Sequence, residues 1–360
     1  MVLYRKYRPQ KFSELIGQKE IITILENEIK QEKIAHAYLF AGPRGIGKTT
    51  LARVLAKAVN CVNRKKGEAE PCNQCLSCLE ITQGKSLDLI EIDAASNRGI
   101  NEIRELKERI RFLPTLSRYK VFIIDEVQML TPEAFNALLK TLEEPPSYAI
   151  FILATTQFYK IPETIVSRCQ VFKLSRVSLA EIASYLKEIA KKEGVKISDK
   201  VAEIVAFRSE GCVRDGLSLL GQILSLGERE ITEAQTELVL PPTQINLIVR
   251  FLHLIIKKQA KEAVTLVNNL LAEGGDLEQF LDDLIEFLRK VILQKVGVLA
   301  ERQFVQFDEE TNKNLIKIAE SVDSKETLLK IIERFLKVKI GFEYHDIPQL
   351  AIELAILDLC

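Results

Sequence analysis

The sequence lacks tryptophan, has only three histidines and two methionines, and carries no excess of charge of either sign. Because 50 basic residues balance 50 acidic ones, the chain as a whole has no net field that would draw it onto nucleic acid, and any such contact has to be local. No run of 18 apolar residues is present, which argues against a transmembrane helix and a membrane partner. The charged start MVLYRKYRPQKF does not resemble a secretory signal, so we expect a cytoplasmic protein.

Short apolar runs alternate with helical patterns over the first half of the chain. The runs are rich in β-branched and aromatic residues and span 36–40, 87–93, 119–125 and 149–156. The helical patterns span about 18–32, 48–60, 100–112 and 131–143, and the last opens with Thr131 as N-cap and Pro132 at the first helical position. Because strands that are buried on both faces are continuously apolar, this alternation predicts an α/β fold with a parallel sheet between helices.

The length of 360 residues and the hydrophobic content of 47% favour two or three domains with packed cores. After about residue 176 the pattern becomes helical, and Pro241 with Pro242 interrupts it, because neither residue can donate a backbone hydrogen bond. We therefore expect domains at 1–176, 177–240 and 241–360. The last domain carries two apolar stripes, which we interpret as core, with contact to other chains as the alternative. They are formed by Phe280, Leu284, Phe287, Leu288, Val291 and Ile292, and by Leu350, Leu354 and Leu357.

The segment GPRGIGKT fits the phosphate-loop pattern G-x-x-x-x-G-K-[ST] and lies between a predicted strand and a predicted helix. Its glycines allow backbone N–H groups to surround phosphate oxygens, and the helix adds its positive N-terminus. Lys48 can reach the outer phosphates and Thr49 can ligate Mg²⁺. The alternative, an accidental glycine turn, does not account for this context. We expect the nucleotide to be bound by Gly42, Pro43, Arg44, Gly45, Ile46, Gly47, Lys48, Thr49 and Thr50.

A second acidic segment, VFIIDEVQML at 121–130, ends a predicted strand in two carboxylates. Asp125 can hold the metal together with Thr49, and Glu126 is placed to polarise the water that attacks the γ-phosphate. A solvated acidic turn is the alternative. Because the carboxyl ends of parallel strands gather the ligand site, ATT at 154–156 belongs to the same cleft. A threonine there can orient the water, and a buried hydroxyl bonded to the backbone is the other interpretation.

Four cysteines form the pattern C-x10-C-x2-C-x2-C within an expected insertion at 61–80. They are Cys61, Cys72, Cys75 and Cys78. Four thiolates at this spacing can close a tetrahedral shell, so we expect Zn²⁺, with an iron–sulfur cluster or plain reduced thiols as the alternatives. No position remains open for a reacting water, which indicates a structural site with no part in the chemistry. The other three cysteines are expected to be ordinary thiols.

The motifs of the chain resemble, in order, those of the gamma/tau subunit of the bacterial DNA polymerase III clamp loader, an AAA+ ATPase. The resemblance covers at least residues 3–220 and is carried by LYRKYRPQKFSELIGQ, GPRGIGKTT, the four cysteines, IDAASNRGI, FIIDEVQML, NALLKTLEEPP, ILATT, SRC and GCVRDGLSLL. It implies a P-loop AAA+ domain with a zinc-knuckle insertion, a helical lid and an all-helical collar. It also implies a motor that hydrolyses ATP in a ring with copies of itself and with sister subunits of the delta and delta-prime type. That motor would open the sliding clamp and place it on primed DNA.

The resemblance also assigns roles to single residues. Lys48, Asp125 and Glu126 keep the catalytic roles given above, and Thr156, or its neighbour Thr155, resembles the first sensor. Arg168 in SRC resembles the arginine finger, which acts on the ATP of the adjacent subunit. Arg214 in GCVRD resembles the second sensor, which contacts the γ-phosphate of its own subunit's ATP. For both arginines a surface ion pair is the alternative. Cys212 stands where the family pattern has serine.

Two further segments resemble functional parts of the family. Tyr7, Arg8, Pro9 and Ile16 resemble the contact to the adenine side of the nucleotide, and a strap packed on the core is the alternative. Asn97 and Arg98 resemble the stretch that couples DNA contact to activation of the catalytic glutamate. From 98 to 120 the net charge is +4, which could face DNA phosphates or form a solvated helix face.

Two rival functions are compatible with a phosphate loop. A nucleotide-binding scaffold that never hydrolyses ATP would be expected to lack Lys48 or Glu126, and both are present. A branch-migration helicase of the AAA+ class would carry a DNA-binding winged-helix domain at its C-terminus. The final 120 residues read instead as helices without a basic recognition helix, which favours the clamp-loader interpretation.

Overall fold

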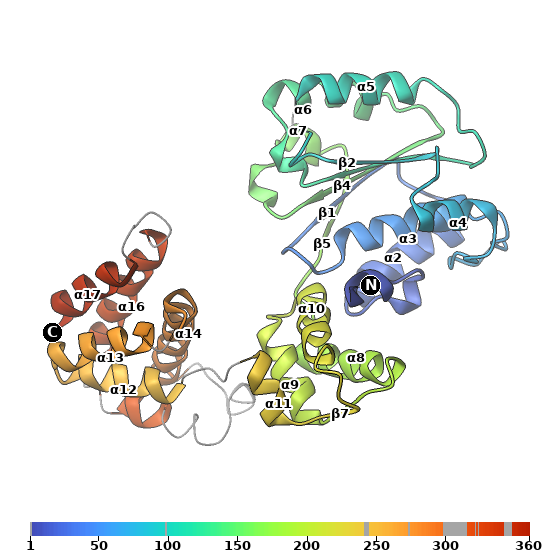
Figure 1. The fold of residues 1–360 in the computed structure, drawn as a ribbon. Helices are drawn as coiled ribbons and strands as arrows, with labels where there is room; N and C mark the ends of the chain where they lie inside the picture. The colour runs from blue at the N-terminus through green and yellow to red at the C-terminus, as the bar shows by residue number, and fades with distance from the viewer. Residues whose placement is uncertain are drawn as a thin grey trace. The chain divides into compact units, whose positions relative to one another are not determined.

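The computed structural model describes residues 2–97, 99–240, 245–272, 274–297, 315–320, 322, 324–341 and 348–360. The chain forms two compact units, Met1–Val239 and Leu240–Cys360 (Figure 1). The boundary between them falls next to the predicted one at 240/241. The division of the first unit at 176/177 stays a prediction.

The first unit contains the predicted parallel sheet, with five strands in the order β2-β3-β4-β1-β5. The strands are β1 (Ala37–Ala41), β2 (Leu89–Asp93), β3 (Lys120–Asp125), β4 (Ala149–Thr155) and β5 (Gln170–Lys173). Side chains alternate between the two faces of the sheet, as the two-residue period of a strand requires. In β1, Tyr38 and Phe40 pack on one face, whereas Ala37 and Leu39 pack on the other.

Helices cover both faces of the sheet, as Figure 1 shows. The face of Tyr38 packs against α2 (Lys19–Lys30) and α3 (Lys48–Asn60), and the opposite face packs against α5 (Ile100–Ile110), α6 (Pro132–Glu143) and α7 (Glu163–Val166). Thr131 caps α6 as predicted, because its hydroxyl accepts a hydrogen bond from Ala134 N at 3.3 Å. The N-terminal segment forms α1 (Leu3–Lys6) and η1 (Phe12–Glu14), and α4 (Leu76–Gln83) follows the cysteines.

A helical region follows β5 within the first unit, as expected. It contains α8 (Leu179–Lys192), α9 (Asp199–Arg208), α10 (Val213–Leu224) and α11 (Glu233–Val239). The expectation that strands stop after about residue 176 is wrong in one detail, because β6 (Lys196–Ile197) pairs in parallel with β7 (Glu230–Ile231). Two-residue strands are too short to produce a hydrophobic period.

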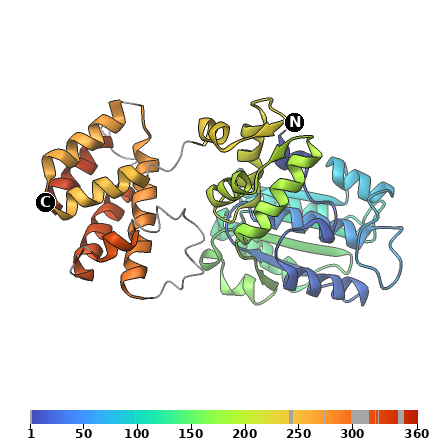
Figure 2. The ribbon, with the colours of Figure 1, turned by 90° about the horizontal axis from the view of Figure 1, so that it is seen from below.

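The second unit is helical among its described residues (Figure 2). Its helices include α12 (Ile245–Ile256), α13 (Ala260–Ala272), α14 (Leu277–Lys295), α16 (Lys325–Gly341) and α17 (Pro348–Leu359), and residues 315–320 are helical as well. The stripe predicted on α14 is confirmed as core, and Phe280 contacts Phe251 with ring centroids 5.4 Å apart. The core interpretation is wrong for Leu350, Leu354 and Leu357, which are 44%, 52% and 62% exposed. Another face of α17, with Ile352 and Ile356, is buried instead, and contact with other chains remains the open interpretation.

Among the described residues, no helix is both long enough and apolar enough to cross a membrane.

Candidate nucleotide site and metal centre

The phosphate loop lies between the end of β1 and the start of α3, as predicted. Gly42 donates its N–H to Thr155 O at 3.1 Å, which fixes the loop to the end of β4. Gly45 has a φ of +76°, a backbone conformation that glycine adopts without strain. A Cβ on Gly42 would lie 2.4 Å from Leu174 O, so a larger residue would also collide with the chain that follows β5. The loop therefore needs glycine both for its conformation and for its close packing.

Lys48 begins α3 and is only 5% exposed. Its ammonium donates hydrogen bonds to Gly42 O and Pro43 O, both at 2.8 Å. Burial lowers the pKa of Lys48, and the nearby charges of Glu126 and Asp125 oppose that shift. The ammonium is thus held over the loop by neutral carbonyl groups.

The two predicted metal ligands, Thr49 on α3 and Asp125 at the end of β3, are in contact. Thr49 Oγ1 donates to Asp125 Oδ2 at 2.6 Å, although the two residues are 76 positions apart. The other carboxylate oxygen, Asp125 Oδ1, accepts the N–H of Glu126 at 2.9 Å. A hydroxyl and a carboxylate in contact at the mouth of a phosphate loop are oxygen ligands of the kind that Mg²⁺ prefers.

Glu126 is held by two polar side chains from neighbouring elements. Its Oε2 accepts hydrogen bonds from Thr156 Oγ1 at 2.8 Å and from Gln128 Nε2 at 2.6 Å. Thr155 is fully buried and donates to Gln128 Oε1 at 2.6 Å, so Thr156 is the threonine that contacts the carboxylate. Sequence reasoning missed Gln128, because a glutamine two residues after an acidic pair carries no recognised spacing signal. Its place in η2 (Val127–Met129) brings it back to Glu126.

The two predicted arginines have different surroundings. Arg214, at the start of α10, donates its backbone N–H to Gly45 O at 3.4 Å, and its guanidinium lies over the ring of Tyr4, 4.8 Å from the centroid. Arg168 follows α7 and pairs with Glu143 on α6 at 2.5 Å. This partly exposed pair contributes under about 1 kcal/mol, so the guanidinium can exchange partners at little cost.

The four cysteines lie together, with their sulfur atoms within 4.8 Å of one another. Backbone N–H groups point at the sulfurs: Cys72 N donates to Cys61 Sγ at 3.2 Å, and Cys75 N donates to Cys72 Sγ at 3.2 Å. Burial alone would raise the pKa of Cys72, but such donors outweigh it and lower the pKa to about 6. Burial raises the pKa of Cys61 and Cys78. The donor set fits a metal bound by four thiolates, for which zinc–sulfur distances of about 2.3 Å are typical.

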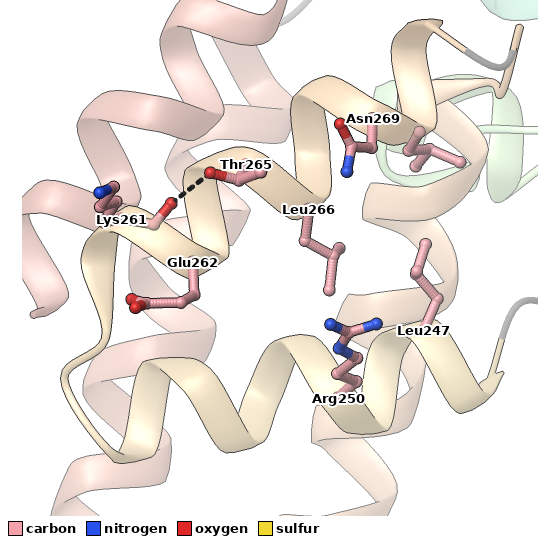
Figure 3. A pocket seen from close by; sticks show the side chains of 8 residues that line it. Leu247, Arg250, Lys261, Glu262, Thr265, Leu266 and Asn269 are labelled. Atoms are coloured by element: carbon pink, nitrogen blue, oxygen red, sulfur yellow. Dashed lines mark hydrogen bonds between the residues drawn. The ribbon is translucent and has the colours of Figure 1, made fainter.

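Two cavities lie away from these groups. One of about 310 Å³ lies in the second unit between α12 and α13, where Figure 3 shows Arg250 beside Leu266 and Leu247. The other, of about 800 Å³, lies between α8 and the β6–β7 pair. Neither is lined by a phosphate-loop residue, so neither is the nucleotide site.

Three protein families match successive parts of the chain. Residues 17–178 match the delta subunit of DNA polymerase III, 181–229 match the ATPase lid domain of the DNA polymerase III clamp loader subunit, and 231–360 match domain III of subunits gamma and tau. Subunit gamma of Buchnera aphidicola subsp. Acyrthosiphon pisum is 39% identical over 337 residues, covering 93% of this chain and 91% of that relative. This chain belongs to the gamma/tau family of DNA polymerase III subunits.

Other gamma/tau relatives are longer than this chain. Subunit tau of Bacillus subtilis is 39% identical over 364 residues, which cover 99% of this chain but 63% of that relative. Among solved structures, the RuvB Holliday junction branch migration motor of Thermotoga maritima has a TM-score of 0.50 and 20% identity, covering 82% of this chain and 92% of that one. That likeness reflects the AAA+ fold alone. Because 231–360 match gamma/tau domain III, the branch-migration interpretation loses its support.

The remaining predicted site residues are Arg8, Pro9, Ile16, Asn97 and Arg98. Arg8 is half-buried, and burial together with the positive charge of Arg53 lowers its pKa. Pro9 and Ile16 are partly buried on either side of η1. Asn97 Nδ2 donates to Asp93 O at 3.0 Å and so caps the end of β2, whereas Arg98 lies outside the described residues.

Proposed function

We propose that this chain is the ATP-hydrolysing motor subunit of a DNA polymerase III clamp loader. The observation that carries the proposal is the contact of Thr49 with Asp125 at 2.6 Å, beside a buried Lys48 and an oriented Glu126. A scaffold that never hydrolyses ATP would have no use for an oriented glutamate. A complete set of catalytic groups therefore supports hydrolysis over the scaffold alternative.

Lys48, Thr49 and Asp125 would hold the ATP phosphates and their Mg²⁺. Lys48 would exchange Gly42 O and Pro43 O for phosphate oxygens, and Thr49 with Asp125 would hold the ion. Bound Mg²⁺ would supply charge neutralisation on the phosphates. The backbone N–H groups of the loop add further donors to the same oxygens.

Glu126 is the group that would orient the attacking water. Thr156 and Gln128 both donate to Oε2, so they fix the direction of the carboxylate. The second oxygen, Oε1, is then the acceptor that is left for water. We assign Thr156 and Gln128 as positioning residues for this glutamate.

Arg168 would complete the site of an adjacent subunit. By leaving Glu143, its guanidinium could offset the charge that develops on the ATP of the neighbour, and such a finger contributes about 10³ to 10⁵ in rate. Hydrolysis then requires a ring that contains copies of this chain and sister subunits of the delta and delta-prime type. Arg214 would leave Tyr4 for the γ-phosphate of its own subunit, which links the angle of the lid to the nucleotide.

The work of this motor would be to open the sliding clamp and load it onto primed DNA in the cytoplasm. Because the chain as a whole has no net charge, its contact with DNA phosphates would depend on basic residues that lie close together. The four cysteines would hold structural Zn²⁺, since their sulfurs lie within 4.8 Å of one another and four thiolates would leave no open position in a tetrahedral shell.

ATP turnover tests the proposal. It should be measured for the chain alone and for the chain assembled with sister subunits, clamp and primed DNA. We expect stimulation only in the assembly, and Arg168→Ala should lower that turnover by about 10³ or more. Arg289→Ala is the matched control, because it removes an arginine from an exposed ion pair with Glu286 at 2.9 Å in the second unit. Equal turnover of the dilute chain alone, or an unaffected Arg168→Ala assembly, would contradict the proposal.

A further inference from the structure

The cysteine insertion contacts the N-terminal segment through a carboxylate. We call residues 61–83 the knuckle and residues 3–14 the strap. Glu70 Oε2 accepts the N–H of Phe12 at 2.9 Å, and Glu70 Oε1 accepts the N–H of Ser13 at 2.7 Å. Phe12 itself is 1% exposed and packs in the same core cluster as Ala69. A single knuckle side chain therefore fixes two consecutive peptide groups of the strap with charge-assisted hydrogen bonds.

A buried lysine makes the second link. Lys57, on α3, is 1% exposed, and its ammonium donates to Gln10 Oε1 of the strap at 2.8 Å and to Thr82 Oγ1 of the knuckle at 2.9 Å. A buried ammonium is costly unless other charges compensate it. Burial lowers the pKa of Lys57, and the two hydrogen bonds to Gln10 and Thr82 satisfy the buried ammonium. The same ammonium therefore joins the knuckle to the strap.

The opposite end of the strap contacts the helices that follow the sheet. Tyr7 donates its hydroxyl to Glu193 Oε1 at 2.5 Å, and Tyr4 lies under the guanidinium of Arg214. The backbone N–H of Arg214 in turn contacts Gly45 O in the phosphate loop. The strap therefore runs from the knuckle to the residues that border the phosphate loop.

Arg8 lies midway along the strap and is half-buried. Burial and the positive charge of Arg53 lower the pKa of Arg8, and the negative charge of Glu91 opposes that shift. The link between the strap and the nucleotide site therefore depends on Tyr4, whose ring lies under the guanidinium of Arg214.

The knuckle has few buried apolar residues that could stabilise its fold without a metal. Apart from two of the cysteines, its buried apolar residues are Ala69, Pro71 and Ile81. The stretch 61–75 has no helix or strand, so the metal has to supply the fold energy that a core would otherwise give.

We infer that the knuckle is a clasp for the strap. With metal on the four cysteines, Glu70 and Lys57 fix residues 10–13 and thereby keep Tyr4 under Arg214, whose backbone N–H contacts Gly45 O of the phosphate loop, so that metal binding strengthens ATP binding. This inference rests on the proposed binding of ATP at that loop. It goes beyond the expectation of a purely structural cysteine site, because the site would act on nucleotide affinity through the strap.

The test uses the full chain and compares Glu70→Ala with Glu68→Ala. Glu68 is an exposed glutamate two residues from Glu70, so its replacement by alanine removes the same charge. Arg64 donates to the backbone carbonyl of Glu68, and the substitution leaves that carbonyl in place. Three quantities are measured: hydrogen exchange of the Phe12 and Ser13 amides, the Kd of N-methylanthraniloyl-ATP, and bound zinc. We expect Glu70→Ala to speed exchange at both amides by about tenfold or more and to weaken analogue binding, while zinc stays bound. Glu68→Ala should change none of the three.

Removal of the metal with a chelator should reproduce both effects in the unaltered chain. Unchanged exchange at Phe12 and Ser13 after Glu70→Ala or after chelation overturns the clasp. Faster exchange with an unchanged Kd overturns the effect of the strap on ATP. If the unaltered chain does not bind the analogue at all, the proposed ATP function fails, while the exchange measurements still decide whether the clasp exists.

Discussion

Replacement of Gly45 by alanine should disrupt the contact between the phosphate loop and α10. Gly45 has a φ of +76°, and a left-handed conformation costs an alanine about 1–2 kcal/mol. The new Cβ would also lie 2.1 Å from Cys212 Sγ, a distance at which one of the groups has to move. Overpacking of this kind costs about 1–3 kcal/mol. The two effects together lower the free energy of unfolding by roughly 2–5 kcal/mol.

A double-mutant cycle with Cys212→Ala separates the two costs. Cys212 is 8% exposed, and burial raises the pKa of its thiol to about 11, so the group that meets the new Cβ is a neutral sulfur. Without that sulfur the nearest atoms are Arg214 Cβ at 3.5 Å and Cys212 Cβ at 3.7 Å, which are ordinary contacts. The double variant should therefore recover the overpacking part, a coupling of about 1–3 kcal/mol, and retain the backbone part.

Urea unfolding followed by hydrogen exchange with mass spectrometry measures these differences, because peptides of Met1–Val239 are followed separately from those of Leu240–Cys360. Gly67→Ala is the control: its φ is +85° and no atom lies within 4 Å of the added Cβ, so only the backbone cost of about 1–2 kcal/mol should appear. Additive effects of Gly45→Ala and Cys212→Ala would refute the argument from steric overlap.

Three further predictions concern stability. Burial alone would raise the pKa of Asp88, but three backbone N–H donors outweigh it and hold the pKa below its ordinary value. Its contribution is therefore complete above a pH of about 4 and is lost as the pH falls further, and Asp88→Asn should remove this part of the acid dependence in urea titrations from pH 3 to 7. Thr131→Ala should cost about 1 kcal/mol in the same measurement at neutral pH, because it removes the cap of α6. Ile352→Ala should cost about 2–5 kcal/mol, whereas Leu354→Ala should cost under about 0.5 kcal/mol in the single chain, since Ile352 is fully buried and Leu354 is 52% exposed; equal losses would contradict the assignment of faces on α17.

The sheet and the phosphate loop could be predicted because their signals are local. A parallel strand that is buried on both faces is continuously apolar, as in β1 and β4, and the spacing of the phosphate loop is a short string. The meeting of Thr49 with Asp125 followed from the rule that strand ends gather at one edge of the sheet.

Contacts between residues that are far apart in the sequence, and that belong to no known motif, could not be predicted. Glu70 and Phe12 are 58 residues apart, and nothing in their spacing indicates that they meet. Gln128 contacts Glu126 through the turn of η2, which depends on a φ of +48° at Glu126 that no residue type signals. On α17 the apolar residues surround the helix, so a spacing of three and four residues cannot tell Ile352 in the core from Leu354 on the surface.

The charged groups of the nucleotide site share one feature that bears on how ATP would enter it. Lys48 is bonded to neutral carbonyls, and Glu126 is bonded to a hydroxyl and an amide. Neutral partners of this kind satisfy a buried charge, yet they form weaker hydrogen bonds than a charged partner does. Exchange of two carbonyl oxygens for phosphate oxygens therefore gains free energy without first breaking an ion pair. For this reason we expect the phosphate loop to bind nucleotide by changing hydrogen-bond partners within a preformed site, while the slower adjustment is that of the strap and α10, where Arg214 has to leave Tyr4.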